Sequence, residues 1–402
     1  MTSVAIIQNV LPHYRVPVFR ALAEQPYIEL TLIYGSNSGD KVADSAQTNV
    51  VGDMPFRVVR GKIRNFGVTG KNILWHKPAV DLLEKERFDV VIHLFESKWA
   101  SLWKIRKLQK QRGDRFILWG HGVCKSSSRL INRLWMRMIR IADAVLFYSA
   151  RGRRRQVERG VEPEKLFVAR NSLALEPIDA AMAGWPQSRL NEFRRDKKLG
   201  NGPVLLCVCR FLKNKRLDLL LRAAARLRVD YPDLKVVLIG DGPCKGELRN
   251  LCDRLNLGSV VLLAGRVIEE TELAPWFLSS DLVVVPGAIG LLAVHAHAYG
   301  RAVVTCDHMA IHGPEIEILI PGQTGALFRG GDAEALAEVV GDILSDPERK
   351  KALGQAAYRR TREDFGTRNM IDGFLQAISY VTGRSLALQE PSSGLVVSGA
   401  IR

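Results

Sequence analysis

The feature that most constrains the fold is an alternation of short apolar runs with helical stretches, which continues along most of the chain. The runs are rich in Val, Leu and Ile, as expected for strands that are buried on both faces of a parallel sheet. Strands that alternate with helices in this way are typical of open α/β sheets. The predicted strands are Val4–Gln8, Glu29–Tyr34, Asp89–Leu94, Phe116–Gly120, Ala144–Ser149 and Phe167–Arg170, then Val204–Val208, Val236–Gly240, Val260–Ala264, Leu282–Pro286 and Ala302–Cys306.

A chain of 402 residues is too long for a single ordinary core, so we expect two domains. The predicted architecture is α/β, with two Rossmann-like domains that face a central cleft. The pattern after residue 332 is helical, with breaks near Asp346 and Gly366. The predicted boundaries are 1–180 for an N-terminal domain, 181–202 for a linker, 203–365 for a C-terminal domain, 366–383 for a final helix whose return to the N-terminal domain is left open, and 384–402 for a flexible tail.

The formal net charge of +16 is unevenly distributed. Residues 1–185 contain 30 Lys and Arg against 17 Asp and Glu, so this half holds nearly all of the excess. A basic half implies an anionic partner, which is a lipid surface, a pyrophosphate-bearing acceptor or nucleic acid. No basic strand has the interleaved aromatic residues that stack on bases, and this disfavours nucleic acid.

One predicted helix carries four arginines on the same face, at Arg129, Arg133, Arg137 and Arg140. Apolar residues fill the rest of this helix, which is typical of an amphipathic helix that lies on a membrane surface. The alternative is a surface helix whose apolar side packs into the core. The sequence leaves both interpretations open, and one helix can serve both purposes.

The compartment is indicated by what the sequence lacks. No basic leader or cleavage site marks a signal peptide, and no window holds the roughly 18 apolar residues of a spanning helix. The six cysteines have no metal-ligand pattern. Cys207 and Cys209 lie two apart on a predicted strand, at about 6–7 Å, which is long for an unstrained disulfide. We predict a reduced, cytoplasmic protein and leave open a peripheral position on the inner face of the plasma membrane.

Candidate binding residues follow the predicted strands, because ligands of open α/β sheets bind beyond the carboxyl ends of the strands. Arg210 and Lys215 follow the strand Val204–Val208. Two cations in such a loop are suited to neutralising a diphosphate. Taken alone, the segment is more simply interpreted as a solvated basic loop.

The loop after Leu282–Pro286 is a second candidate. Gly287 and Gly290 would let the backbone approach an anion closely. Leu291 and Leu292 begin the next helix, where backbone N–H groups form a phosphate site. A turn with two glycines is weak evidence by itself, since many α/β loops have one.

Three polar residues complete the candidates. His295 and His297 lie two apart and so cannot share a helical face, and we interpret His297 as a core residue. Glu315 precedes an apolar helix. It is either a first-turn acid favoured by the helix dipole or a carboxylate that faces the ligand.

In their order along the chain, these segments resemble the donor-binding domain of glycosyltransferase family 4, which consists of retaining enzymes with the GT-B fold. The resemblance extends over residues 203–330, and the order of the motifs is more specific than any single motif. The matching segments are Cys209–Lys215, Leu238–Pro243 with Glu247 and Leu248, Val261–Gly265, Gly290–Gly300, Gly313–Glu315 and Gly322–Gly325.

The first half resembles a bacterial polysaccharide-related subgroup of the same family through Gln8–Arg20. His121 matches the position where the family places a histidine near the donor sugar, and Asn171 matches the Pro-Asn turn before the linker. The resemblance implies that the N-terminal domain binds the acceptor and the C-terminal domain binds the nucleotide-sugar donor.

Two positions depart from the family pattern. Most members carry two glutamates eight positions apart, the first associated with the reacting sugar and the second with the ribose hydroxyls. Gly287 and His295 stand at these positions here. A histidine can still hydrogen-bond ribose, but a glycine cannot replace a carboxylate. The subgroup works without that group, Glu315 or His121 takes its place, or the chain is catalytically weakened.

The resemblance implies a retaining, metal-independent hexosyltransferase. It would move a sugar from a nucleotide-diphosphate sugar to a lipid-linked or polysaccharide acceptor of a cell-surface glycan, such as exopolysaccharide, lipopolysaccharide or O-antigen. No metal site and no cofactor besides the donor substrate are expected. The implied catalytic residues are His121, Arg210, Lys215 and Glu315, and the implied donor-binding residues are Arg210, Lys215, Gly287, Gly290, Leu291, Leu292 and His295.

Two other classes of protein stay open at this point. One is another GT-B enzyme, such as a nucleotide-sugar epimerase or a phosphorylase. The other is a catalytically weak, transferase-like protein that binds anionic lipid or nucleic acid.

Overall fold

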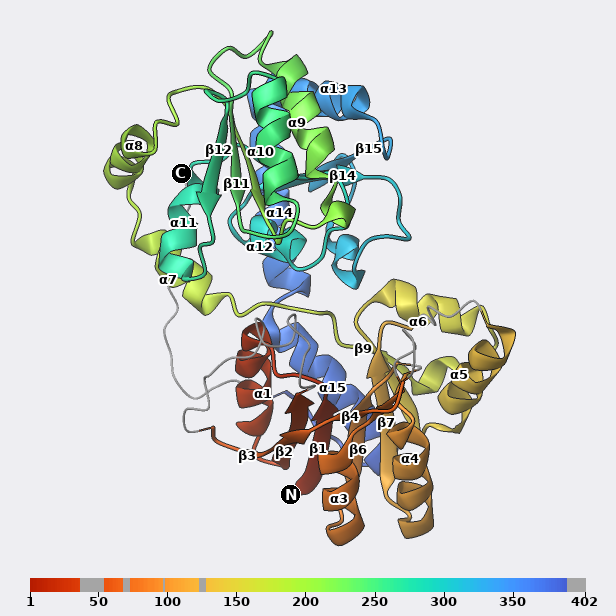
Figure 1. The fold of residues 1–402 in the computed structure, drawn as a ribbon. Helices are drawn as coiled ribbons and strands as arrows, with labels where there is room; N and C mark the ends of the chain where they lie inside the picture. Colours follow the sequence, from red (N-terminus) through yellow and green to blue (C-terminus); the bar gives the residue numbers. More distant parts are fainter. Residues whose placement is uncertain (37–53, 68–72, 97, 123–127, 389–402) are drawn as a thin grey trace. The chain divides into compact units, whose positions relative to one another are not determined.

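The computed structural model describes residues 1–36, 54–67, 73–96, 98–122 and 128–388 (Figure 1). It consists of two compact units. The N-terminal unit comprises Met1–Phe147, Arg155–Ala169 and the segment from Ile371 onward, and the C-terminal unit comprises Tyr148–Arg154 and Arg170–Met370. Of the predicted tail, residues 389–402 lie outside the described part.

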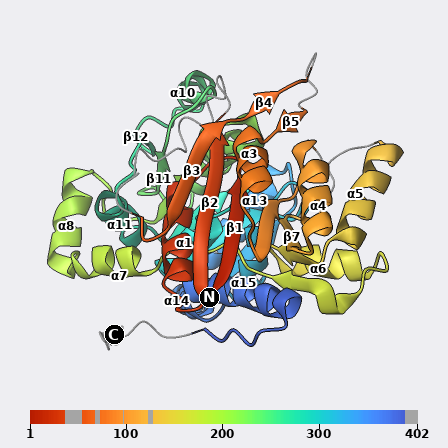
Figure 2. The ribbon, with the colours of Figure 1, turned by 90° about the horizontal axis from the view of Figure 1, so that it is seen from below.

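The N-terminal unit is built on a seven-stranded parallel sheet in the order β3-β2-β1-β6-β7-β8-β9. Figure 2 shows β1, β2 and β3 side by side. The strands are β1 (Thr2–Gln8), β2 (Ile28–Ser36), β3 (Arg57–Lys62), β6 (Val90–Leu94), β7 (Arg115–Gly120), β8 (Ala144–Phe147) and β9 (Leu166–Val168), and β4 (Arg64–Asn65) and β5 (Leu74–Trp75) form a separate small ribbon.

Helices cover both faces of this sheet. One face packs against α3 (Lys77–Lys85), α4 (Ser101–Arg112) and α5 (Arg129–Ile141). On the other face, Trp119 of β7 meets Phe19 of α1 (Val16–Ala23) and Phe374 of α15 (Thr367–Thr382) in edge-to-face contacts. The buried tryptophan therefore ties the first and last helices to the same sheet.

The C-terminal unit has a six-stranded parallel sheet in the order β12-β11-β10-β13-β14-β15. The chain runs outward from β10 to β12 and then crosses to β13, so the order reverses between β10 and β13. This reversal is the place where open α/β sheets bind ligands. The strands are β10 (Val204–Val208), β11 (Lys235–Ile239), β12 (Val261–Gly265), β13 (Leu282–Val285), β14 (Ala302–Cys306) and β15 (Gly325–Phe328).

Helices also pack on this second sheet, where α9 contacts α13 and α12 contacts α14. The breaks predicted near Asp346 and Gly366 are confirmed as the ends of α13 and α14. The helices are α7 (Glu176–Ala183), α8 (Gln187–Asp196), α9 (Leu217–Leu227), α10 (Lys245–Arg254), α11 (Glu270–Leu278), α12 (Leu292–Ala298), α13 (Ala333–Leu344) and α14 (Pro347–Asp364), with α6 (Ala150–Val157) at the division between the units.

The strand pattern is confirmed except at the two edges where the sequence predicts no strand. The edge strand β3 carries exposed Arg57, Arg60 and Lys62, which interrupt its apolar pattern. The edge strand β15 is only four residues long and starts at Gly325. These edge strands are less completely buried than the central strands, so their sequences carry a weaker apolar signal.

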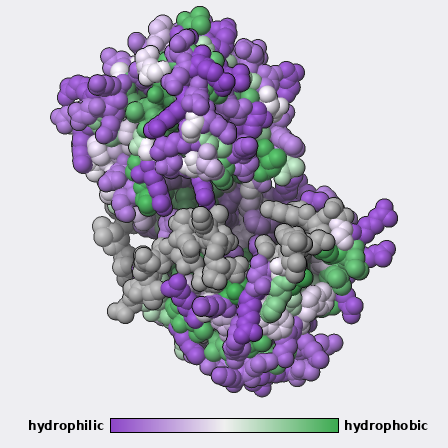
Figure 3. All heavy atoms as spheres, viewed as in Figure 1, coloured by the Kyte–Doolittle hydropathy of each residue, from purple (hydrophilic) through white to green (hydrophobic). Residues whose placement is uncertain are grey.

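Helix α5 packs into the core on one side, as one of the two interpretations of its sequence predicts. Trp135, Met138 and Ile139 are buried in the core, whereas Leu130 and Leu134 are 65% and 42% exposed. Figure 3 shows an apolar area with hydrophilic residues beside it at the position of α5. The arginines Arg129, Arg133, Arg137 and Arg140 are all exposed. One side of α5 thus packs inward while a second apolar strip faces solvent.

No helix in the described residues is long and apolar enough to cross a membrane. The cysteines among these residues are free thiols. Cys207 and Cys209 share a face, with their Sγ atoms 3.7 Å apart.

Candidate functional site

The loops after β10 and β13 are joined through Lys215. Its ammonium Nζ donates a hydrogen bond to the carbonyl oxygen of Ala288 at 2.6 Å. In return, the N–H of Gly287 donates to the carbonyl oxygen of Lys215 at 2.9 Å, and the N–H of Ala288 donates to that of Asn214 at 2.8 Å. A half-buried cation is thereby fixed at the point where the strand order reverses.

Gly287 is packed directly against this loop. A Cβ atom at Gly287 would lie 2.0 Å from the carbonyl oxygen of Asn214 and 2.7 Å from the carbonyl carbon of Lys215. Any side chain there would have to displace the backbone that carries the lysine. The family-typical carboxylate is therefore sterically incompatible with this loop arrangement.

A carboxylate from another strand end lies nearby. Glu315 belongs to the short 3-10 turn Pro314–Ile318, and only 6% of its surface is exposed. Its Oε2 lies 3.6 Å from the Cβ position of Gly290, and its Oε1 accepts a hydrogen bond from the Asn171 side-chain amide at 2.5 Å. Glu315 therefore borders the glycine loop and is held by Asn171.

His312 connects the loops after β13 and β14, a role that its sequence pattern did not indicate. The N–H of Ile289 donates to Nδ1 of the imidazole at 3.3 Å, and Nε2 donates to the carbonyl oxygen of Cys306 at 2.9 Å. Burial lowers the pKa of His312, so the neutral ring that these two bonds require is favoured. The N–H of Gly313 also donates to the carbonyl oxygen of Ile289 at 2.8 Å, which ties the Glu315 turn to the glycine loop.

His295 on α12 contacts a carboxylate that the sequence reasoning missed. Its Nε2 lies 2.8 Å from Oε1 of Glu270, the first residue of α11. The Tyr299 hydroxyl donates to the same oxygen at 2.5 Å. Burial and this hydrogen bond raise the pKa of Tyr299, so it stays a hydrogen-bond donor. Glu270 is one of two adjacent glutamates at the start of an apolar helix. In the sequence, this pattern predicts only ordinary first-turn acids.

The remaining predicted residues are placed as follows. Arg210 is exposed after β10, and Leu291 and Leu292 are half-buried where α12 begins. His121 is exposed after β7 in the N-terminal unit. His297 is fully buried in α12, and burial lowers its pKa to about 3, which confirms that it is a core residue.

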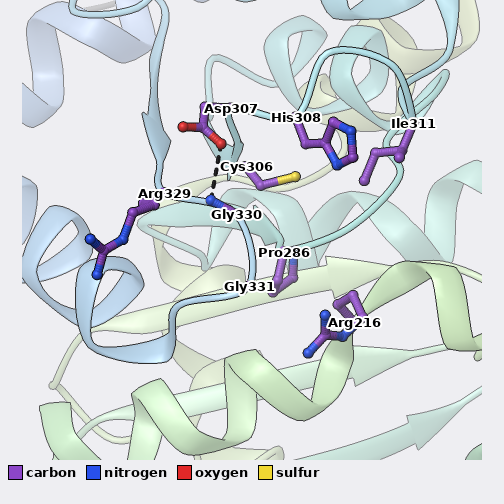
Figure 4. Close-up of a pocket in the computed structure, with 9 residues that line it drawn as sticks. All are labelled: Arg216, Pro286, Cys306, Asp307, His308, Ile311, Arg329, Gly330 and Gly331. Atoms are coloured by element: carbon purple, nitrogen blue, oxygen red, sulfur yellow. Dashed lines mark hydrogen bonds between the residues drawn. The ribbon is translucent and has the colours of Figure 1, made fainter.

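A pocket of about 510 Å³ lies next to the loops after β10 and β13, on the β14 and β15 side (Figure 4). Two arginines of the pocket form ion pairs, Arg216 with Asp218 and Arg329 with Asp332. The side chain of Asp307 accepts a hydrogen bond from the Gly330 N–H. None of the sequence-predicted residues lines it. Within the described part of the chain, no three His, Cys, Asp or Glu side chains are grouped to hold a metal ion.

Two Rossmann-like units, each built on a parallel sheet, are the architecture of the GT-B fold. Comparison with family models agrees. Residues 188–360 match "Glycosyl transferases group 1" and residues 19–176 match "Glycosyltransferase Family 4". The chain belongs to the family 4-like glycosyltransferases with the GT-B fold.

Similar proteins include a GDP-mannose-dependent α-(1-6)-phosphatidylinositol monomannoside mannosyltransferase of Mycolicibacterium smegmatis, which is 29% identical over 66% of this chain and 71% of its own length. A D-inositol 3-phosphate glycosyltransferase of Streptomyces avermitilis is 34% identical, but over only 37% of this chain and 33% of its own. The crystal structure of Anabaena HepE in complex with UDP has a TM-score of 0.72 at 16% identity, covering 94% of this chain and all of that one. This likeness shows the fold.

Proposed function

We propose that the chain is a retaining, metal-independent transferase that moves a sugar from a nucleotide-diphosphate sugar to a lipid-linked or polysaccharide acceptor of a cell-surface glycan. The observation that carries this proposal is the fixed ammonium of Lys215 at the switch point, with the buried Glu315 beside the adjoining glycine loop. The mannosyltransferase relative, which uses GDP-mannose and a lipid acceptor, and the HepE complex with UDP support it.

In the proposed mechanism, Arg210, Lys215 and the backbone N–H groups of Gly290–Leu292 hold the diphosphate. Negative charge grows on the leaving phosphate as the bond to the sugar breaks, and fixed donors stabilise that charge. The acceptor hydroxyl attacks from the same face and gives its proton to the leaving phosphate. Glu315 and His121 position the reacting sugar.

The test begins with thermal unfolding of the protein in a panel of nucleotide sugars. The true donor is expected to raise the midpoint, because a ligand of the folded state stabilises it by mass action. Release of nucleoside diphosphate should then require acceptor, persist in EDTA, and give a product with the donor's anomeric configuration by NMR. Release without acceptor would point to an epimerase or hydrolase. Stabilisation by no nucleotide sugar would contradict the proposal.

We further propose that α5 attaches the N-terminal unit to an anionic bilayer. The exposed apolar strip of Leu130, Leu134 and Ile141 runs beside the four exposed arginines. Apolar side chains can enter the acyl boundary while the guanidinium groups meet lipid phosphates. An acceptor carried by lipid would be presented at the same surface.

The variant Arg133→Ala with Arg137→Ala is expected to bind anionic vesicles about 30-fold more weakly, because each surface cation contributes about 1 kcal/mol. Sedimentation with phosphatidylglycerol vesicles at low and high salt measures this. Leu134→Gln should weaken binding as well, while Val229→Gln, an exposed residue of the C-terminal unit, should not. Wild-type protein that fails to sediment at low salt would exclude the membrane surface.

A further inference from the structure

The second glutamate position of the family is occupied by His295, yet a carboxylate lies within hydrogen-bond distance of it. His295 and Tyr299, one turn apart on α12, both reach Oε1 of Glu270, at 2.8 and 2.5 Å. The Phe277 ring stacks on Tyr299 with centroids 4.7 Å apart and contacts His295 at 4.6 Å. Because both donors reach one oxygen and both rings are packed, the Glu270 carboxylate is held in one orientation.

This carboxylate is accessible to a ligand, while its partners are more covered. The Glu270 side chain is 26% exposed and the His295 side chain 16%. Glu270 is therefore the more exposed member of this hydrogen-bonded pair.

The order of strands in the sheet places the Glu270 carboxylate on a defined side of Lys215. Glu270 starts the helix after β12, Lys215 follows β10, and Glu315 follows β14. In the order β12-β11-β10-β13-β14-β15, Glu270 and Glu315 therefore lie on opposite sides of the lysine. His295 is three residues beyond Leu292, which is about 4.5 Å along the helix axis, so the group lies close to the predicted diphosphate contacts.

Glu270 and Glu315 lie on the two sides of Lys215. In a nucleotide-diphosphate sugar, the nucleoside and the sugar likewise lie on the two sides of the diphosphate. If the sugar lies toward Glu315, the nucleoside lies toward Glu270. An ionised carboxylate has about four lone-pair sites on its two oxygens, more than the two bonds that His295 and Tyr299 make to Oε1, so it can also accept a hydrogen bond from a ribose hydroxyl. Bonds to a charged acceptor are the stronger ones.

We propose that Glu270 binds the ribose hydroxyls of the donor nucleoside and that His295 and Tyr299 are positioning residues for it. The inference rests on the proposed function, because it needs a nucleotide at this site. In this chain the ribose carboxylate would then come from α11, and the histidine on α12 would orient it. A purely structural link between α11 and α12 is the alternative.

The experiment compares three classes of ligand by calorimetry, namely the ribonucleotides uridine diphosphate and guanosine diphosphate, their 2′-deoxy counterparts, and inorganic pyrophosphate. Wild-type protein should prefer the better ribonucleotide over its 2′-deoxy form about tenfold. Glu270→Ala should weaken that ribonucleotide about 10- to 100-fold, as expected for lost bonds to a charged group. It should abolish the preference over the 2′-deoxy form and leave pyrophosphate binding unchanged.

Glu272→Ala is the matched control, since Glu272 is an exposed acid in the same first turn of α11. It should bind all ligands as wild type does. Glu270→Gln keeps the size of the side chain. If Glu270→Ala does not fold, the same comparison of ligand affinities is made with Glu270→Gln. His295→Ala should weaken the ribonucleotide and leave pyrophosphate unchanged.

Two results separate the inference from the function on which it rests. An equal loss for ribonucleotide, 2′-deoxynucleotide and pyrophosphate would show that Glu270 is structural and would overturn the inference. Wild-type protein that binds none of the nucleotides would instead refute the proposed donor site itself.

Discussion

Lys215→Ala is expected to lower kcat/KM for sugar transfer about 100- to 1,000-fold, which is the usual loss when one preorganised donor to a developing negative charge is removed. The ammonium of Lys215 is fixed by its bond to the Ala288 carbonyl, and the loop around it is tied to Gly287 by backbone bonds. The cation therefore needs little reorganisation when the leaving group gains charge. Steady-state kinetics with the stabilising donor measures the loss.

Lys213→Ala is the matched control, because Lys213 belongs to the same 3-10 turn but is exposed. Its kcat/KM should stay within about twofold of wild type, as for a surface charge that is screened by salt. Thermal unfolding of both variants separates lost chemistry from lost folding. Transfer that survives Lys215→Ala, or falls equally in Lys213→Ala, would remove the lysine from the mechanism.

The sequence predicted the fold well because the strands of both sheets are buried on two faces and read as continuous apolar runs. The two edge strands escaped prediction for the same physical reason. Arg57, Arg60 and Lys62 are tolerated in the edge strand β3 because their side chains are exposed to solvent. The local sequence does not indicate that a segment pairs at the edge of a sheet.

The contacts of the site could be predicted only in part. The loop residues Arg210 and Lys215 follow from the rule that ligands bind beyond strand ends. The bond from Asn171 to Glu315 spans 144 positions, and the bond from His295 to Glu270 spans 25. Periodicity indicates which face of an element a residue occupies, but not which distant side chain it meets. Such partners are visible only in the structure.

Gly287 shows most clearly what the sequence could not decide. Compared with the family pattern, it reads as a lost carboxylate and suggests a weakened enzyme. In the structure, its hydrogen is the only substituent that fits against the backbone of Asn214 and Lys215. The backbone of Lys215 can therefore occupy its position only because residue 287 has no side chain.

Gly287→Glu, which installs the family-typical carboxylate, is consequently expected to lower the rate of transfer about 100-fold rather than raise it. The side chain would overlap the carbonyl oxygen of Asn214, and overpacking of this kind costs about 1–3 kcal/mol of stability. Relief of the overlap must move the backbone of Lys215, and a displacement of about 1 Å lowers rates about 100-fold. The midpoint temperature of thermal unfolding and kcat/KM should both be lower than in the wild type.

Gly287→Ala tests the same point without adding a charge. It should share most of the loss, because the overlap arises at Cβ. Gly246→Ala is the control, since a Cβ at Gly246 on α10 would meet no atom within 4 Å, and it should leave transfer unchanged. A decayed transferase makes the opposite prediction, because in that case Gly287→Glu restores a missing catalytic group and raises kcat/KM. The sign of this one change therefore distinguishes an active enzyme with a rearranged site from a weakened one.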